Sequence, residues 1–152
     1  MERTDNARLP LVEIRAVCDC AEVDIKDVKR YARKVMAETG NRTCELSILL
    51  ADDAFVRDLN RRYRSVDRTT NVLAFPQQDG SQALPIPTTL GDVVISVEKA
   101  GRDSAAAGHS LSDELKKLIV HGVLHLLGHD HRTQAQARRM RELEQTIMAR
   151  AG

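Results

Sequence analysis

The segment His121-Gly122-Val123-Leu124-His125-Leu126-Leu127-Gly128-His129-Asp130-His131 holds four of the five histidines in this 152-residue chain. Apolar side chains before and within it recur every three or four positions, which predicts a helix from Leu111 to Leu127. Ser110, with Asp113 three residues later, is a suitable N-cap for that helix. Gly128 is a natural end, because glycine adopts the left-handed conformation that terminates helices.

The histidine spacing predicts a metal site. His121 and His125 lie one turn apart on one helix face, so both imidazoles can reach one ion. In a continuous helix His129 would lie about 12 Å along the axis from His121, too far for an ion whose bonds to nitrogen are about 2.0–2.1 Å. A turn at Gly128 would instead return His131 to the ion. We therefore predict that His121, His125 and His131 bind the metal.

Three histidines leave a fourth coordination position open, whereas structural zinc sites generally have four protein ligands and favour cysteine. No cysteine lies near the segment, so the pattern favours a catalytic ion. Asp130 is expected either to orient a ligand imidazole or to stabilise the turn after Gly128. The spacing is also similar to the metzincin peptidase pattern H-E-x-x-H-x-x-G-x-x-H, but Gly122 stands where these enzymes have their general-base glutamate. A metallopeptidase is therefore the disfavoured alternative.

The histidine segment resembles the signature of the YbeY family of bacterial metal-dependent endoribonucleases, also called rRNA maturation factors, which is H-G-x-L-H-L-x-G-[YH]-D-H. Two earlier segments agree, in family order. Residues Asn60–Pro76 resemble N-x-x-Y-R-x-x-D-x-x-T-[ND]-V-L-[SA]-F-P, and Leu90–Ser96 resemble L-G-D-[IV]-x-I. His129 stands where many members have tyrosine, and Val123 where some have serine. The family's length fits the whole chain.

The resemblance implies a metal-dependent, single-strand-directed endoribonuclease that acts in ribosomal RNA maturation, at the 16S 3′ end, and in ribosome quality control. It implies one Zn²⁺ per chain, or another divalent transition metal in its place. The implied partners are single-stranded ribosomal RNA, the small ribosomal subunit and its assembly factors. A ribosome-associated assembly factor with a mainly structural metal is a further alternative.

The resemblance also implies that Arg64 is the functional arginine, a choice that the residues alone do not make over Arg61 and Arg62. An arginine suits phosphodiester cleavage, because its permanent planar charge can stabilise the negative charge that gathers on the phosphoryl oxygens. The structural alternative for Arg64 is an ion pair with Asp67. Asp92 is expected to be a turn residue, or else to support a metal ligand.

Net charge, cysteine content and apolar runs bear on RNA binding and on the cellular compartment. The net charge of +1 is no signature of nucleic-acid binding, so an RNA surface must come from local basic clusters. Such clusters occur at residues 57–68 and 26–34, although each alone is typical of a solvated helix face. Cys18, Cys20 and Cys44 are odd in number, which predicts free thiols in a reducing cytoplasm. No apolar run approaches the roughly 20 residues of a membrane span, and the first residues lack a signal-peptide core.

The length suits one domain over residues 1–152. Strand and helix patterns alternate along it, which predicts an α/β (α+β) fold with about four strands and helices on the faces of the sheet. The resemblance implies that the sheet is mixed. The expected strands are Leu9–Val17, Cys44–Leu50, Val72–Phe75 and Leu90–Val97. The expected helices are one from Asp24 to near Gly40, one from Asp52 through Tyr63, Val97–Ala107, Leu111–Leu127 and Thr133–Ala149. The proline-rich segment Gln77–Thr89 is expected to be a loop and a mobile edge of the site.

Overall fold

The computed structural model of the chain describes residues 10–77 and 89–152. Within them the elements follow in the order β1 (Leu11–Ala16), α1 (Ile25–Glu38), β2 (Glu45–Ala51), α2 (Asp53–Arg64), β3 (Val72–Pro76), β4 (Thr89–Ser96), α3 (Val97–Ala107), α4 (Leu111–Leu126) and α5 (Gln134–Ala151). Every expected helix and strand is present, with small shifts at the ends. The loop expected over Gln77–Thr89 lies, apart from its two ends, outside the described residues.

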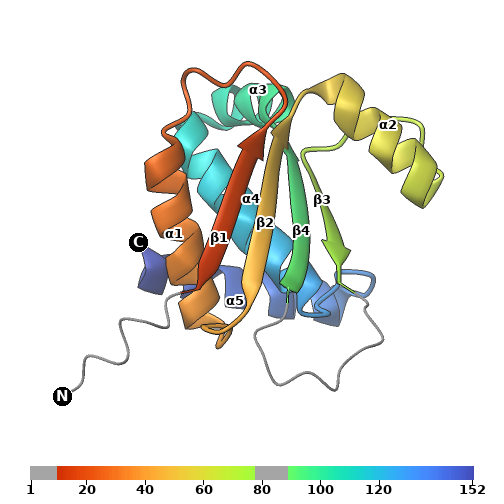
Figure 1. The fold of residues 1–152 in the computed structure, drawn as a ribbon. Helices are drawn as coiled ribbons and strands as arrows, with labels where there is room; N and C mark the ends of the chain where they lie inside the picture. Colours follow the sequence, from red (N-terminus) through yellow and green to blue (C-terminus); the bar gives the residue numbers. More distant parts are fainter. Residues whose placement is uncertain (1–9, 78–88) are drawn as a thin grey trace.

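The strands form one mixed sheet in the order β1-β2-β4-β3, as expected. Figure 1 shows β1, β2 and β4 running in parallel and β3 running antiparallel beside β4. Backbone hydrogen bonds join Gln77 to Leu90 and Asn71 to Ser96 across this last pair. Because hydrogen-bonded positions alternate in an antiparallel ladder, the backbone groups of Val72 and Ala74 point to the free edge of the sheet.

Helix starts follow from capping side chains. The predicted cap of α4 is confirmed, because Ser110 accepts a hydrogen bond from the backbone N–H of Asp113. Asp24 and Asp52, the expected first residues of their helices, cap α1 and α2 in the same way by accepting from Asp27 and Phe55. Thr133 precedes α5 as its N-cap and forms a reciprocal capping box with Gln136. Each such cap satisfies a donor that the helix itself leaves unpaired.

Most helices lie on one side of the sheet. Helices α1 and α4 pack on the face of the sheet that is turned away from the viewer in Figure 1, and α5 packs against both of them. The main core lies between these layers and includes the fully buried Met36, Ile48, Ile95, Ile119 and Leu124. On the opposite face, α2 contributes a smaller cluster in which Val56 packs with Leu73 and Val94. No described helix has the length and apolar character that a bilayer crossing requires.

Two glycines bring α4 close to the sheet. A Cβ at Gly122 would lie 2.8 Å from Val93 Cγ1, and a Cβ at Gly91 would lie 2.7 Å from Leu126 Cδ2 and 2.5 Å from the Phe75 carbonyl oxygen. Gly91 also has a φ of +151°, which favours glycine. This close approach places the C-terminal half of α4 against β4 and the edge strand β3, where the histidines lie.

Candidate metal centre

The structure brings His121, His125 and His131 together, as the spacing predicts. One ring nitrogen from each lies within 4.8 Å of the others, so these three residues could hold a metal ion. The Nε2 atoms of His121 and His125 are 3.1 Å apart. The ring centre of His131 lies 5.9 Å from that of His121 and 5.2 Å from that of His125.

A glycine turn at the end of α4 makes this grouping. Gly128 adopts a φ of +98°. The N–H of Gly128 donates to the carbonyl of His125, and the N–H of His129 donates to the carbonyl of Leu124. These two bonds form a Schellman motif, which reverses the chain after a helix. The reversal returns His131 to the face of α4 that carries the other two histidines, whereas His129 lies outside the group.

Glu144, on α5, contacts the buried side of the cluster. Its Oε2 lies 2.5 Å from Nδ1 of His121, and its side chain is 18% exposed. When Nδ1 donates this hydrogen bond, the lone pair of the imidazole lies on Nε2, the atom that faces His125. The sequence reasoning missed Glu144, because it is one of several charged residues on a helix that is far from His121 along the chain.

Asp130 stabilises the turn, which was one of its two expected roles. It accepts a hydrogen bond of 2.7 Å from the backbone N–H of His131 and forms an ion pair of 2.9 Å with Nε of Arg132. The bond from His131 holds the pKa of Asp130 below its ordinary value. The distance from Asp130 to Nδ1 of His131 is 3.9 Å, too long for a hydrogen bond.

Burial favours the metal-binding form of His125. Desolvation lowers the pKa of His125, and the neighbouring His121, His131 and Arg64 lower it further, against a smaller opposing effect of Asp130. A lowered pKa favours the neutral imidazole, which is the form that binds a metal.

Arg64 lies in the same cavity as the three histidines. The cavity has a volume of about 490 Å³, and its other wall is the edge of β3 from Val72 to Ala74. Arg64 is the last residue of α2, and its Nη2 donates a 2.8 Å hydrogen bond to the carbonyl oxygen of Ala74. Its guanidinium lies 5.6 Å from the centre of the Phe75 ring.

The neighbouring arginines have other partners. The alternative ion pair of Arg64 with Asp67 is wrong, because Asp67 pairs with Arg57 at 2.8 Å. Arg61 and Arg62 both pair with Asp58, at 2.6 and 2.9 Å. The structure therefore distinguishes Arg64 from Arg61 and Arg62, which the residues alone did not.

Both expectations for Asp92 are wrong. Asp92 lies within β4, opposite Phe75, rather than in a turn. Side chains alternate between the faces of a strand, and the next residue, Val93, faces α4. Asp92 therefore points to the opposite face of the sheet, away from the histidines, where it lines a separate groove.

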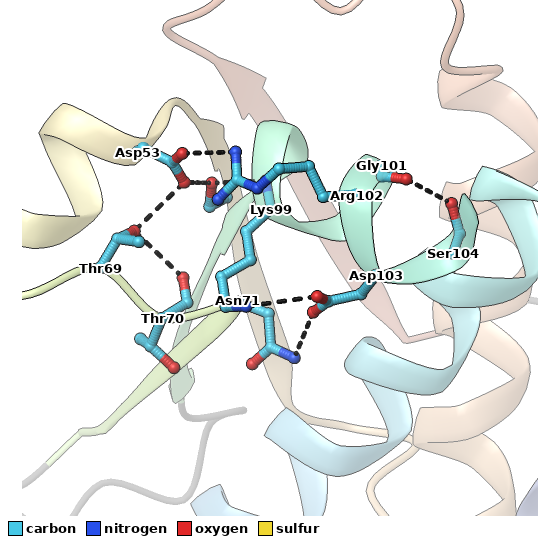
Figure 2. A network of polar contacts seen from close by, with 10 residues as sticks. Asp53, Thr69, Thr70, Asn71, Lys99, Gly101, Arg102, Asp103 and Ser104 are labelled. Atoms are coloured by element: carbon cyan, nitrogen blue, oxygen red, sulfur yellow. Dashed lines mark hydrogen bonds and ion pairs between the residues drawn. The ribbon is translucent and has the colours of Figure 1, made fainter. Parts of the chain in front are cut away.

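A polar network fixes the segment that leads into β3, and Figure 2 shows its two carboxylates. Asp53 accepts hydrogen bonds of 2.7 Å from Ser96, 3.2 Å from Thr69 and 2.8 Å from Arg102. Partial burial raises the pKa of Asp53, but the bonds from Arg102, Ser96 and Thr69 outweigh this effect and hold the pKa below its ordinary value. The network thus ties the start of α2 to α3.

The second carboxylate, Asp103, continues the network toward the cavity. It accepts a 3.3 Å hydrogen bond from Asn71, which lines the cavity, and forms a 3.2 Å ion pair with Lys99 (Figure 2). The cavity wall is therefore held by side-chain contacts as well as by the pairing of β3. The sequence reasoning missed these contacts, because the residues of the network come from α2, β4, α3 and the loop before β3.

Comparison with known proteins points to one family. The family model described as "Endoribonuclease YbeY" matches residues 14–152. Proteins named endoribonuclease YbeY from Rhodopseudomonas palustris (strain BisA53) and Salinispora tropica are 38% and 42% identical, and the matches cover 94% and 85% of this chain and 87% and 88% of those proteins.

A solved structure shares the fold. The solution structure of TM1509 from Thermotoga maritima matches with a TM-score of 0.64 at 18% identity, over 93% of this chain and 89% of that one. The family model and the relatives cover nearly all of the sequence that builds the sheet, the histidine turn and α5. The chain belongs to the YbeY endoribonuclease family.

Proposed function

We propose that this chain is a zinc-dependent, single-strand-directed endoribonuclease that acts in ribosomal RNA maturation, at the 16S 3′ end, and in ribosome quality control. We assign metal binding to His121, His125 and His131, and a catalytic role to Arg64. The proposal rests on one observation: the guanidinium of Arg64, which has no carboxylate partner among the described residues, lines the same cavity of about 490 Å³ as the three histidines. The family's endoribonuclease activity supports RNA as the substrate.

The donor set fits a zinc-like ion. Nitrogen ligands suit Zn²⁺ and related transition metals, whereas Mg²⁺ and Ca²⁺ prefer oxygen. The lowered pKa of His125 and the contact of Glu144 with His121 both favour imidazoles whose lone pairs are available to one ion. Three protein ligands would leave a fourth coordination position of a zinc ion available to water or substrate.

The metal ion and the protein side chains would have separate roles in the reaction. When bound, the ion supplies a Lewis acid beside the scissile phosphodiester. Arg64 stabilises the negative charge that develops on the phosphoryl oxygens, and its bond to Ala74 fixes the guanidinium before substrate binds. Glu144 holds the proton of His121 at Nδ1 and thereby fixes the ring orientation.

The peptidase alternative is disfavoured on structural grounds as well. Gly122 packs against Val93, with 2.8 Å from an ideal Cβ to the nearest methyl carbon. A side chain at this position would force Val93 to shift. The glycine itself supplies no carboxylate to act as the general base that the metzincin pattern requires.

We place the enzyme in the cytoplasm, with the small ribosomal subunit and its assembly factors as partners. The family name supports an RNA substrate. None of the three cysteines forms a disulfide within the described part of the chain, which is usual for cysteines in a reducing compartment.

The test is cleavage of a defined RNA, single-stranded and as a duplex, by zinc-loaded and metal-stripped protein. Arg64→Ala is the catalytic variant, and Arg61→Ala is the matched control because Arg61 lies on the same helix and pairs with Asp58. We expect cleavage of the single strand by wild type and by Arg61→Ala only when zinc is present. Equal cleavage by wild type, Arg64→Ala and the metal-stripped protein would favour the assembly-factor alternative.

A further inference from the structure

The sheet face that carries α2 is only partly covered. Beside α2 it forms a groove of about 400 Å³ that crosses all four strands. Its floor includes the apolar Leu49 on β2 and Val94 on β4. Arg15 on β1 lies at one end, and Phe75 on β3 lies at the other. Figure 1 shows this face toward the viewer, with α2 at its upper right.

Tyr63 and Phe75 form an aromatic pair at the β3 end of the groove. Their ring centres are 5.7 Å apart, with planes inclined at 69°. The periodicity of α2 places Tyr63 on the apolar side of the helix, yet Tyr63 is 65% exposed. The chain has only two tyrosines, two phenylalanines and no tryptophan, so half of these rings lie together at one groove. An exposed aromatic pair of this kind is typical of a surface that stacks on a partner.

The groove adjoins the histidine cavity through Arg64. The guanidinium of Arg64 lies 5.6 Å from the Phe75 ring centre and also lines the cavity. Alternation along β3 points Phe75 into the groove and leaves Ala74 in the cavity wall. A flexible polymer that reaches the histidines past Arg64 would therefore lie next to the aromatic pair.

Positive charges lie around the groove, where they can meet the phosphates of a single-stranded nucleic acid whose bases enter the groove. Arg15 and Arg64 have no carboxylate partner among the described residues, so each can meet a phosphate. Arg62 lies 5.8 Å from the Tyr63 ring centre and adds a third guanidinium, although it also pairs with Asp58. Asp92, within the groove, repels phosphate but can accept hydrogen bonds from base amino groups.

We propose that this groove is a second contact site for the RNA substrate, in which unpaired bases stack on Tyr63 and Phe75 while Arg15 meets a phosphate. The inference rests on the proposed ribonuclease function and adds a reason for preferring single strands. Duplex RNA keeps its bases stacked on one another and offers no free base face to an aromatic ring. A single strand can place its bases in the groove and its next phosphate at the histidines.

The first test is fluorescence anisotropy of a short labelled single-stranded RNA with metal-stripped protein, so that binding is measured without cleavage. Loss of one stacking contact weakens binding by roughly 5- to 150-fold, and we expect Tyr63→Ala to fall in this range. Tyr63→Phe should bind like wild type, because it keeps the ring. Phe55→Ala is the matched control, since Phe55 is a 37% exposed aromatic at the other end of the same helix. It should leave binding unchanged.

An abasic strand of the same length separates stacking from phosphate contact. Wild type should bind the abasic strand about as weakly as Tyr63→Ala binds the normal strand, and Tyr63→Ala should lose little more on the abasic strand. In steady-state cleavage by zinc-loaded protein, Tyr63→Ala should act mainly on KM, whereas Arg64→Ala should act mainly on kcat. Thermal unfolding of Tyr63→Ala should match that of wild type.

The outcomes distinguish the two proposals. A wild type that neither binds nor cleaves RNA overturns the ribonuclease proposal itself. A wild type that cleaves RNA, with Tyr63→Ala binding as tightly as wild type, overturns the groove alone. Equal binding of normal and abasic strands by wild type also overturns the groove as a base-stacking site.

Discussion

At the scale of single residues, the contact of Glu144 with His121 shows how a helix far along the chain can orient a proposed metal ligand. The 2.5 Å contact at Nδ1 fixes which nitrogen of His121 faces His125. A hydrogen bond that an imidazole N–H donates to a carboxylate fixes the orientation of a metal-binding histidine ring and increases metal affinity. The effect of Glu144 should therefore be on metal binding first, and on activity only as a consequence.

Glu144→Gln should weaken zinc binding by about 10- to 100-fold, because a neutral amide is a poorer acceptor for the imidazole N–H. The measurement is competition for zinc with a chromogenic chelator. Glu142→Gln is the control, since Glu142 is an exposed residue of the same helix. Equal affinities for the two variants would show that the contact does not support the metal site.

Two histidine variants test which residues bind the ion. His131→Ala should lose the ion, because only two imidazoles remain at the site. His129→Ala should keep about one ion per chain, since His129 contributes its backbone N–H to the turn. Elemental analysis of the purified variants gives the stoichiometry, and metal loss from His129→Ala with retention by His131→Ala would reverse the ligand assignment.

At the scale of elements, the position of α4 depends on its close packing against β4. Gly122 allows this approach, because any Cβ there would meet the side chain of Val93. Helix propensity alone would favour alanine at a helical glycine. Replacement by alanine should therefore change the stability in opposite directions at two helical glycines of this chain.

Gly122→Ala should destabilise the fold by about 1–3 kcal/mol, as overpacking of a close-packed interface generally does. Gly101→Ala, in the middle of α3, should instead be neutral or stabilise by up to about 1 kcal/mol, because nothing lies within 4 Å of its Cβ position. Urea unfolding measures both. A stabilising Gly122→Ala would mean that Val93 moves aside and that the approach of the helix is not fixed by this glycine.

The network at Asp53 predicts an acid dependence of stability. Its hydrogen bonds lower the pKa of Asp53 from the ordinary value of 3.8. An acid with a lowered pKa in the folded state binds its proton less readily there than in the unfolded chain. Its stabilisation is therefore fully present above pH 3.8 and is lost as the pH falls through the lowered value.

Asp53→Asn should accordingly have a lower Tm than wild type at neutral pH, and the gap should narrow as the pH falls below about 4. Thermal unfolding at a series of pH values gives both curves. Asp113→Asn, an exposed residue in the first turn of α4, is the control for general acid effects. A gap that stays constant down to low pH would show that the Asp53 charge contributes nothing to the network.

At the scale of the whole molecule, the cavity is assembled from parts that are far apart in sequence. The C-terminus of α2 supplies Arg64, the edge of β3 supplies one wall, and α4 with its turn supplies the histidines. Folding of all three layers is needed before guanidinium and imidazoles face one cavity. Loss of Arg64 should therefore impair chemistry without disturbing either the fold or the metal.

Arg64→Ala should lower single-turnover cleavage by roughly 10²–10³-fold, the usual effect of losing one donor to transition-state charge. Metal content should stay the same, because Arg64 is not a ligand, and stability should change little, because the side chain is exposed. Arg64→Lys should restore little activity, since a point charge does not reproduce the planar contact. Wild-type rates for Arg64→Ala would remove Arg64 from the catalytic role.

The sequence by itself determined what depends on local geometry. Helical periodicity and the stop at Gly128 were enough to group His121 with His125 and to choose His131 over His129. Capping residues located the helix starts for the same reason, because each cap bonds within its own first turn. The mixed sheet was expected from the family resemblance and is confirmed.

Only the tertiary structure decided contacts between elements. It paired Arg61 and Arg62 with Asp58 and left Arg64 in the histidine cavity. It also placed Glu144 beside His121 and turned Asp92 to the far face of the sheet. Spacing along the chain fixes which residues share a helix face or a strand face. It does not fix which face of one element meets another, because that choice is made by the packing of the whole core.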